Sequence, residues 1–369
     1  MAGSIYGTLF RLSTWGESHG DGIGVVVDGC PAGLPLTEEA VQQYLNRRKP
    51  GQTRYSTPRR ENDTVSILSG VFEGRTTGTP ISMLVKNESQ RSSDYSEIAG
   101  YYRPGHADYT MDQKYGFRDY RGGGRTSARE TIGRVAGGAV ASKLLEELGI
   151  SVCAYTRSIG PVSINYKNCS KENIEKSPLR MPDLHASEQA EELLEKTMKE
   201  QDSLGGIIEC IVSGVPAGIG EPVFDKLDAC LAHAVLSIGA TRGIEFGAGF
   251  DAAAMRGSED NDGFTADACG HVRKTSNNAG GILGGMSDGS EIIFRTAFKP
   301  TPSISREQQT VNKAGEPITV SVRGRHDPIV VPRAVVVVES MAAVAIADLM
   351  MCSMSSRLDR MKDFFGKTK

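Results

Sequence analysis

The chain has 369 residues, and length alone permits either about two to three domains or one large one. Hydrophobic residues make up 39% and charged residues 24%, which is the balance of an ordinary soluble globular protein. A net charge of −3 gives no global field for nucleic acid or an anionic membrane, and the aromatic content of 6% leaves few platforms for stacked bases. Composition therefore argues against nucleic-acid and membrane partners.

The cysteines are scattered, odd in number and without a C-x-x-C pair. This pattern predicts reduced thiols in a cytoplasmic protein rather than disulfides or zinc ligands. Arg11 and Glu17 interrupt the N-terminal segment, and we expect neither a secretory signal nor a transmembrane stretch. The seven cysteines are Cys30, Cys153, Cys169, Cys210, Cys230, Cys269 and Cys352.

Strands and helices alternate along the chain. We predict strands from β-branched or alternating runs bounded by Gly or Pro, and helices from apolar residues at helical spacing. In chain order the sequence predicts an alternating stretch over 5–14, a strand over 24–28, a helix that begins after the N-cap Thr37 and runs through Leu45, strands over 65–72 and 80–85, helices over 128–148 and 186–202, a strand over 206–215, a helix over 221–236, strands over 244–250 and 292–298, and an apolar helix within 332–349.

The helix over 128–148 has the clearest pattern, and Gly137-Gly138 inside it predicts close packing against another backbone. No linker separates two domains, and the patternless segments are rich in Gly, Asp and Asn. Loops of that length inside a compact protein are often functional. We therefore expect an α/β (α+β) fold in which residues 1–369 form one domain with long site-forming loops. Those loops cover about 47–63, 90–127, 251–288 and 299–330.

Five arginines crowd the first of these loops. Such a cluster is usually a solvated charge run. Pro50-Gly51 and Thr57-Pro58 stiffen the loop, however, and a stiff loop can hold guanidinium groups for a phosphate or carboxylate. From this segment alone, solvation and anion binding remain equal alternatives. The arginines are Arg47, Arg48, Arg54, Arg59 and Arg60.

The segment from Arg121 to Thr131, RGGGRTSARET, directly precedes the clearest helix. Free backbone N–H groups at a helix N-terminus favour an anion, and Arg121, Arg125 and Arg129 add formal charge. The alternative is that three glycines only form a turn. The segment is neither a phosphate-binding P-loop, because no Gly-Lys-Ser/Thr follows, nor a Rossmann fingerprint, because no hydrophobic strand leads into it.

His19 and His106 lie in Gly-flanked loops beside Ser18 and Asp108. A lone His is more often a structural residue, so general acid chemistry and a structural role are equal alternatives here. His185, His233 and His271 lack such context and are expected to be structural. No H-x-x-x-H or E-x-x-H spacing is present, and we expect no metal site.

Two further segments combine stiff backbone with few bulky side chains. Residues 298–303 (FKPTPS) offer one cation, two hydroxyls and two prolines, and residues 277–285 (NNAGGILGG) offer accessible backbone amides. Each is explained equally well by turn chemistry alone. Together they suit a planar cofactor that carries phosphate.

Read together, these segments resemble the chorismate synthase family. The resemblance spans essentially the whole chain, and several long motifs occur in register. It rests on Gly16-Glu17-Ser18-His19-Gly20 running on to Asp28-Gly29-Cys30-Pro31, on Gly124-Arg125-Thr126-Ser127-Ala128-Arg129-Glu130-Thr131, on Arg325-His326-Asp327-Pro328 through Pro332-Arg333-Ala334 to Glu339, and on residues 48–54, 103–108 and 299–301.

The resemblance implies a β-α-β sandwich with helices between sheets. It also implies a phosphate lyase that converts 5-enolpyruvylshikimate-3-phosphate to chorismate by 1,4-anti elimination, the last step of the shikimate pathway. The family requires reduced FMN without net redox change, some members use NADPH as reductant, and members are usually homotetramers. Because the substrate carries two carboxylates and a phosphate, arginines are expected to dominate its pocket.

The resemblance also assigns expected roles. His19 would protonate the departing phosphate, His106 would stabilise the reduced flavin, and Asp327 with Ser18 would accept a proton. Arg48, Arg54 and Arg129 would hold substrate anions, with Arg48 and Arg54 also candidates for NADPH. The residues expected to line the flavin are Arg125, Thr126, Ser127, Gly239, Ala240, Gly284, Lys299, Pro300, Thr301, Pro302, Ser303 and Arg325.

A few positions depart from the family pattern. Thr126 stands where Ser is frequent, and Gly239 and Arg242 replace residues of other sizes. Because glycine has no side chain, Gly239 could keep only a backbone contact with the flavin. Two rival functions are a true flavin reductase, for which the chain shows no dinucleotide fingerprint, and a non-catalytic anion- or nucleic-acid-binding module, against which the composition argues.

Overall fold

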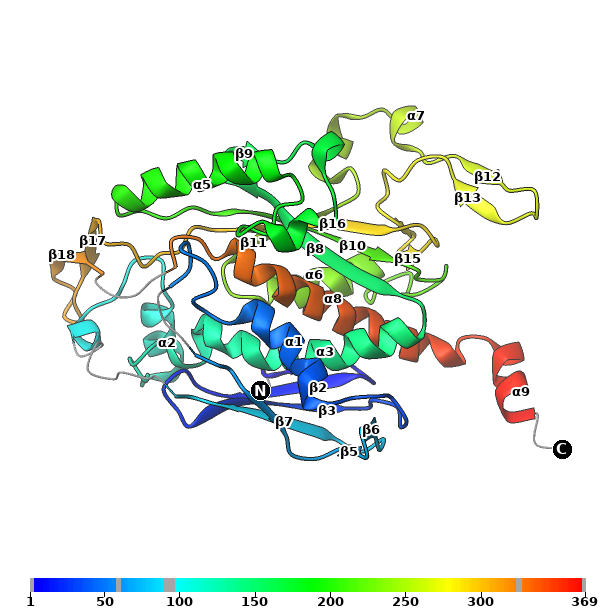
Figure 1. Cartoon of the computed structure of the whole chain (residues 1–369), viewed down its shortest axis with the longest axis horizontal. Coiled ribbons are helices and arrows are strands. Elements are labelled where there is room, and N and C mark those ends of the chain that lie inside the picture. Colours follow the sequence, from blue (N-terminus) through cyan, green and yellow to red (C-terminus); the bar gives the residue numbers. More distant parts are fainter. Residues whose placement is uncertain (1–2, 58–60, 89–96, 323–326, 367–369) are drawn as a thin grey trace.

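Two five-stranded antiparallel sheets enclose a layer of helices in this computed structural model, which describes residues 3–57, 61–88, 97–322 and 327–366 (Figure 1). The first sheet has the order β1(Ile5–Tyr6)-β2(Arg11–Gly16)-β3(Gly22–Asp28)-β7(Ile81–Lys86)-β4(Val65–Ile67). The second has the order β11(Thr241–Phe246)-β16(Ile292–Phe298)-β10(Gly206–Ser213)-β8(Ser151–Ile159)-β9(Val162–Ser163).

The helices between the sheets are α1 (Glu38–Arg48), α3 (Thr131–Glu147), α6 (Leu227–Leu236) and α8 (Val331–Cys352). α3 packs on β2, β3 and β7, α8 packs on β8 and β10, and the two helices pack against each other. The predicted α+β sandwich with helices between sheets is therefore confirmed. The prediction that the whole chain forms one domain stays a prediction.

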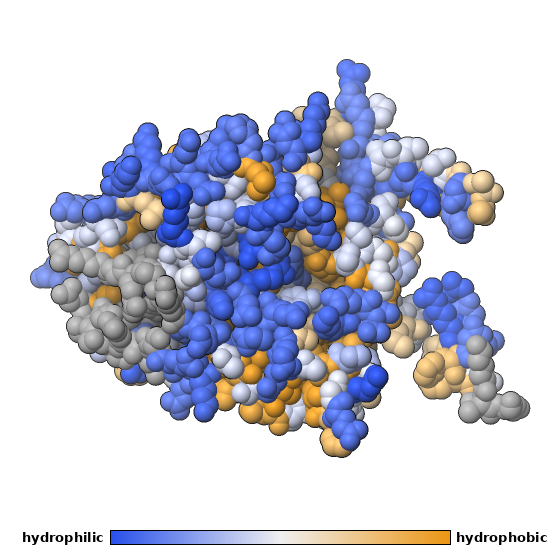
Figure 2. Space-filling model, in the orientation of Figure 1, coloured by the Kyte–Doolittle hydropathy of each residue, from blue (hydrophilic) through white to orange (hydrophobic). Residues whose placement is uncertain are grey.

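Smaller elements surround this sandwich. Two longer helices are α2 (Asp108–Tyr115) and α5 (Leu184–Lys199), α9 (Leu358–Gly366) extends away from the body, and a short helix α4 (Asn173–Lys176) precedes α5. The hairpins are β5(Val71–Phe72)-β6(Arg75–Thr76), β12(Phe264–Ala266)-β13(Val272–Lys274), β14(Ile282–Leu283)-β15(Met286–Ser287) and β17(Glu307–Val311)-β18(Pro317–Ser321). Figure 2 shows mostly hydrophilic residues on the viewed face, with apolar patches near the first sheet and on α9.

The close packing predicted at Gly137-Gly138 is confirmed. A Cβ atom on Gly138 would lie 2.2 Å from the Cβ of Ser340 in α8, and one on Gly133 would lie 3.2 Å from the carbonyl oxygen of Gly24 in β3. Only glycine permits this approach of α3 to both neighbours. Thr37 is also confirmed as the N-cap of α1, since its hydroxyl accepts the N–H of Ala40 at 3.2 Å.

Three predicted boundaries were wrong. The strand over 65–72 is two strands, because Gly70 turns the chain at φ +82°. The helix over 221–236 begins only at Leu227, whose N–H donates to the carbonyl oxygen of Gly285 at 2.7 Å. The strand over 244–250 begins at Thr241 and ends at Phe246, because Gly247 takes φ +54°.

The central helix α8 is apolar along almost its whole length. The stretch Val331–Ser355 is long and apolar enough to cross a membrane, but 83% of its most apolar window is buried inside the protein. That burial is typical of a core helix of a folded domain rather than of a membrane span.

One buried carboxylate ties α8 to the N-terminal segment. Asp348 accepts the backbone N–H groups of Thr8, Leu9 and Phe10 at 2.8, 2.7 and 2.9 Å. We expect Asp348→Ala to lower the free energy of unfolding by about 2–4 kcal/mol, because three donors lose a charged acceptor. Urea denaturation would measure this, and Asp348→Asn, which keeps one carbonyl oxygen, should lose less. Equal stability of all three proteins would contradict the anchoring role.

Candidate active site

The described parts of three predicted site loops, 47–63, 90–127 and 299–330, lie at one end of the sandwich, on the left of Figure 1, which we call the loop end. The fourth predicted loop, 251–288, lies on the opposite side. The N–H of Leu204, just before β10, donates to the carbonyl oxygen of Pro328 at 3.1 Å. Arg333 at the start of α8 donates from Nε to the carbonyl oxygen of Arg48 at 3.1 Å, and Arg48 at the end of α1 donates to the carbonyl oxygen of Ala128 at 3.4 Å. Ends of α1, α3, α8 and β10 therefore converge here.

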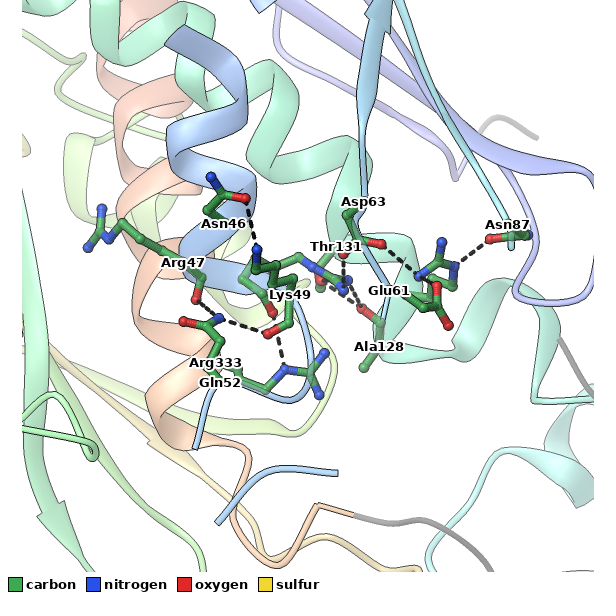
Figure 3. A network of polar contacts seen from close by, with 12 residues as sticks. Asn46, Arg47, Lys49, Gln52, Glu61, Asp63, Asn87, Ala128, Thr131 and Arg333 are labelled. Carbon is green, nitrogen blue, oxygen red and sulfur yellow. Dashed lines mark hydrogen bonds and ion pairs between the residues drawn. The ribbon is translucent and has the colours of Figure 1, made fainter. Parts of the chain in front are cut away.

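A single buried carboxylate, Asp63, holds two of the predicted anion-binding arginines. Arg48 Nη2 lies 3.0 Å from Asp63 Oδ2, and Arg129 Nη1 lies 3.0 Å from Asp63 Oδ1. The Asp63 side chain has no exposed surface, and Figure 3 shows it between α1 and the start of α3. Its backbone takes φ +49°, a conformation that Asp and Asn tolerate better than most residues. Asp63 thus sets the spacing of the two guanidinium groups.

Arg48 is held in the interior. Its side chain is only 2% exposed and also donates to the hydroxyl of Thr131 at 3.3 Å. Burial, followed by the positive charges of Arg333 and Arg129, lowers the pKa of Arg48 to about 10, although Asp63 opposes this shift. Held by these contacts, Arg48 stabilises the loop end. Its contact with a ligand anion stays a prediction. Its buried Nε has no hydrogen-bond partner among the residues that the structure describes.

Arg129 connects Asp63 to the histidine loop. Its guanidinium contacts Glu61 and the side-chain oxygen of Asn87. Asn87 in turn donates from Nδ2 to the carbonyl oxygens of Glu17 and Gly20, at 2.9 and 2.7 Å. These two acceptors bracket Ser18 and His19, so Asn87 fixes the turn that carries both predicted catalytic residues.

Ser18 and His19 pack against the glycine-rich loop. The hydroxyl of Ser18 donates to the carbonyl oxygen of Gly122 at 3.0 Å, and a Cβ on Gly122 would lie 2.5 Å from His19 Nε2. Any larger residue at Gly122, which takes φ +61°, would collide with the imidazole. The Arg121 guanidinium donates to both carboxylate oxygens of Asp119 at 2.8 Å and lowers the pKa of that carboxyl, with a smaller contribution from His19.

Asp327, the predicted proton acceptor, lies between a backbone donor and an arginine. The N–H of Thr57 donates to Oδ1 at 2.7 Å, and Arg333 Nη1 contacts Oδ2 at 2.5 Å. Because Arg333 also donates to Arg48, Asp327 belongs to one continuous polar network that leads to the histidine loop. In order, that network is Asp327, Arg333, Arg48, Asp63, Arg129, Asn87 and the turn from Glu17 to Gly20.

The predicted flavin segment 299–303 meets His106. Nδ1 of His106 lies 2.9 Å from the carbonyl oxygen of Pro104, and Nε2 lies 2.8 Å from the Ser303 hydroxyl. Since a carbonyl can only accept, Nδ1 carries the proton and Nε2 accepts from Ser303. Lys299 donates from Nζ to the carbonyl oxygen of Gly105 at 2.7 Å and from its backbone to that of Ala240 at 3.0 Å. Two predicted loops thus form one wall of the site, made of His106, Lys299, Ser303 and the backbone of Ala240, which we call the His106 wall.

The imidazole of His106 is held neutral. Burial, reinforced by Arg103 and by Lys299, lowers the pKa of His106 from 6.5 to about 4. The unfolded chain therefore binds more protons than the folded one between these values, and this residue's share of the unfolding free energy falls as pH drops from 6.5 to 4. Above pH 6.5 the share is fully present, and it amounts to about 2–3 kcal/mol.

We therefore expect the wild type to lose up to about 2 kcal/mol more stability than His106→Gln when denaturation is compared at pH 7.5 and pH 5. Glutamine keeps a hydrogen-bond acceptor for Ser303 but does not titrate. Parallel pH profiles for the two proteins would show that His106 does not carry a depressed pKa.

Other predicted residues lie around this end in distinct positions. Arg54 is 66% exposed and pairs with Glu195 at 2.6 Å on the outer helix α5, so it is not beside Arg48. Arg125 donates to the hydroxyl of Thr14 at 2.7 Å and to the carbonyl oxygen of Gly16 at 3.2 Å. It thereby ties the glycine-rich loop to the end of β2.

Thr126 donates to the carbonyl oxygen of Gly123 at 2.7 Å, and the hydroxyl of Ser127 accepts the N–H of Arg129 at 3.3 Å. Both hydroxyls serve the turn that starts α3. Gly239 is exposed, and a Cβ there would meet open space. Arg325 lies outside the described residues.

Gly284 is not brought to the His106 wall within one copy of the chain. The β14-β15 turn lies at the start of α6 and β16, whereas Ala240 follows the end of α6 and Lys299 follows the end of β16. Seven residues of β16 separate the two positions by roughly 20 Å.

A cavity of about 280 Å³ opens beside Arg333. Four cations line it, and Glu175 is the one acidic residue in its lining. Arg47 is held there by the buried carboxylate of Glu339 at 2.6 Å. The cations are Arg47, Lys176, Arg180 and Arg333. This cavity extends the positive character of the loop end.

Several organising residues escaped the sequence analysis. Asp63, Asn87 and Glu61 occur in polar segments without any periodic or motif signal. Arg333 stood inside a recognised motif, Pro332-Arg333-Ala334, without an assigned role. Arg333 lies at the start of a predicted helix, six residues after Asp327. This short separation was a usable signal, because residues on either side of a helix start can contact each other.

The fold and the loop end together define an α+β enzyme built to handle small anionic molecules. The sequence profile of the chorismate synthase family matches residues 10–351. The chain is 68% identical to the chorismate synthase of Lachnoclostridium phytofermentans, with full coverage of both proteins, and 54% identical to that of Methanosarcina acetivorans, covering 96% and 97%. It resembles a crystal structure of chorismate synthase with a TM-score of 0.77 and 31% identity, covering 98% and 97%.

The chain therefore belongs to the chorismate synthase family. This confirms the predicted family, the sandwich fold, the lyase class and a role in the shikimate pathway. The rival interpretation as a non-catalytic binding module is disfavoured by identity of this extent.

Proposed function

We propose that the loop end catalyses the 1,4-anti elimination of phosphate from 5-enolpyruvylshikimate-3-phosphate, giving chorismate. The polar network from Asp327 to the turn of Ser18 and His19 carries this proposal, because it links the expected proton acceptor to the expected proton donor. His19 donates a proton to the departing phosphate. Asp327 takes up the proton lost from carbon, together with Ser18, which lies beside His19 in the same turn.

The charge of the loop end suits a substrate with two carboxylates and a phosphate. Arg129 and Arg333 already lie in fixed positions, each held by an acidic residue, and each guanidinium has further donors to offer a ligand anion. Arg48 holds both through Asp63 and its own carbonyl oxygen. Arg54 would reach the substrate only after leaving Glu195 on α5.

The His106 wall fits the phosphate-bearing flavin that the family uses. The hydroxyl oxygen of Thr301 is buried and has no hydrogen-bond partner within the described part of the chain, although a buried polar atom normally has one. Open space over Gly239 and the backbone of Ala240 at φ +72° leave room for a planar ring. The residues that would hold reduced FMN are Lys299, Pro300, Thr301, Pro302, Ser303, Gly239, Ala240, Arg125, Thr126, Ser127 and Arg325.

Reduced FMN would supply electron density to the reacting ring without net redox change. The protein's share is orientation and charge: the neutral His106 offers hydrogen bonding beside the ring, and Lys299 and Arg125 supply positive charge. NADPH as an external reductant, bound through Arg48 and Arg54, belongs to the same proposal.

Assembly into a homotetramer is also part of the proposal. Gly284 lies at the far end of β16 from the His106 wall, so it can join the flavin site only if another copy of the chain supplies it. A cytoplasmic location is consistent with seven cysteines that form no disulfide. Native mass spectrometry would test the assembly directly.

An anaerobic assay tests the activity. The protein is mixed with dithionite-reduced FMN and 5-enolpyruvylshikimate-3-phosphate, while chorismate absorbance and phosphate release are followed together. Equal amounts of chorismate and phosphate, without net flavin oxidation, are expected. NADPH consumed in proportion to product would instead support the flavin reductase, and absence of both products would refute the proposal.

A further inference from the structure

The β12-β13 hairpin projects from the body on the side opposite the loop end (Figure 1). Its tip, which joins Ala266 to Val272, reads Asp267-Ala268-Cys269-Gly270-His271. The sequence analysis expected His271 to be structural, because it lacks the loop context of His19 and His106, and separately expected no metal site, because no H-x-x-x-H or E-x-x-H spacing is present. The structure instead brings three different donor types together at this tip.

Three donor atoms converge there. One carboxylate oxygen of Asp267, Sγ of Cys269 and a ring nitrogen of His271 all lie within 4.8 Å of one another, and Asp267 Oδ2 is 3.0 Å from His271 Nδ1. Four ligands around one zinc-sized ion, at bond lengths of about 2.0 Å for N and O and 2.3 Å for S, would stand about 3.3–3.7 Å apart. Rotation of exposed side chains closes the remaining difference.

The backbone of the tip leaves these atoms available. Oδ1 of Asp267 accepts the N–H groups of Cys269 and His271, both at 2.9 Å, and the backbone N–H of Asp267 donates to the carbonyl oxygen of His271 at 3.0 Å. Hydrogen bonds to Oδ1 therefore shape the loop, while Oδ2 points to the imidazole.

We propose that the tip residues Asp267, Cys269 and His271 form a binding site for a thiophilic divalent transition metal such as Zn²⁺. A thiolate, an imidazole and a carboxylate suit Zn²⁺ or Co²⁺ and do not suit Mg²⁺ or Ca²⁺, which prefer oxygen. Three protein ligands leave a fourth position for water or for a donor from another molecule. Binding releases the thiol proton of Cys269.

One neighbour opposes binding. Arg273 Nη2 lies 3.7 Å from Asp267 Oδ2, and its charge would repel a cation. The Arg273 side chain is 72% exposed, however, and can turn into solvent. Arg273→Gln should therefore strengthen metal binding, whereas an ordinary ion pair among Asp267, His271 and Arg273 would gain nothing from that change.

Cobalt titration of the tag-free, chelator-treated protein tests the site, because a thiolate ligand gives Co²⁺ a charge-transfer absorption in the near ultraviolet. We expect one Co²⁺ per chain, displaced by Zn²⁺. Cys269→Ser should abolish the charge-transfer band, His271→Ala should weaken binding at least about tenfold, and Arg273→Gln should tighten it. Cys352→Ser, which alters a partly buried thiol elsewhere, should leave the titration unchanged.

Absence of the band in the wild type, or its persistence in Cys269→Ser, would overturn the proposal. An unchanged affinity in His271→Ala would do the same for the three-ligand arrangement. Circular dichroism of each variant checks that the fold is intact. Chorismate formation should be unaffected by the tip variants, so the metal site and the proposed activity can fail independently.

Discussion

Replacing His19 by alanine is expected to lower turnover by roughly 10²–10⁴-fold while leaving the fold intact. The imidazole is buried against Gly122, in a turn that Asn87 holds through two carbonyl oxygens. Asn87 donates those hydrogen bonds to backbone carbonyl oxygens, so they survive the substitution, and the loss falls on proton donation to the departing phosphate. Stopped-flow measurement of chorismate absorbance with reduced FMN would give the rate.

Two comparisons isolate the chemistry of His19. His19→Gln keeps a polar side chain of similar reach but cannot serve as a proton donor at neutral pH, and it should be as slow as the alanine variant. Added imidazole should partly restore His19→Ala. His185→Ala removes an exposed histidine on α5 and should retain full activity. A near-normal rate in both His19 variants would remove this residue from the mechanism.

Asp63→Asn is expected to lower the free energy of unfolding by about 3–5 kcal/mol. The carboxylate has no exposed surface and is shared by Arg48 and Arg129. Removing its charge leaves the Arg48 guanidinium buried without a counter-ion, and that penalty is much larger than the loss of one surface ion pair. Asparagine also tolerates the positive φ of this position, so the backbone contributes little to the change.

Urea denaturation followed by circular dichroism measures the effect. Asp28→Asn provides the matched control, because it breaks the pair with Arg11, in which both side chains are about half exposed. Asp28→Asn should lower the free energy of unfolding by less than about 1 kcal/mol. If Asp63→Asn were no more damaging than Asp28→Asn, the proposed charge balance of the loop end would be wrong.

Local patterns predicted the elements whose signals are local. The strand over 24–28, the N-cap Thr37 and the helix over 128–148 follow from spacing and side-chain chemistry, and the structure confirms them. β8 (Ser151–Ile159) was missed because small and polar residues interrupt its alternation, and it becomes a strand only by pairing with β10. Such pairing depends on residues 47 to 62 positions away, from Ile159 with Gly206 (206 − 159) to Ser151 with Ser213 (213 − 151).

The site shows the same division. His19, His106 and Asp327 were predicted because they stand in distinctive motifs, yet their partners were not. That Ser303 meets His106, or that Asp63 joins Arg48 to Arg129, depends on how distant loops fold together. Burial of Arg48 could not be read from a loop that also contains four other arginines. The sequence shows which residues are charged, but the tertiary structure determines which charged residues pair with each other.

The buried helix α8 also constrains how the protein can be made. Residues 331–352 fill the space on which β8 and β10 pack and supply the Asp348 carboxylate to residues 8–10. During translation nearly nine-tenths of the polypeptide leaves the ribosome before this helix exists. The second sheet must therefore wait with part of its inner face uncovered, although α3 can already cover the first sheet. That uncovered face makes the nascent chain a candidate client for chaperones and exposes it to aggregation.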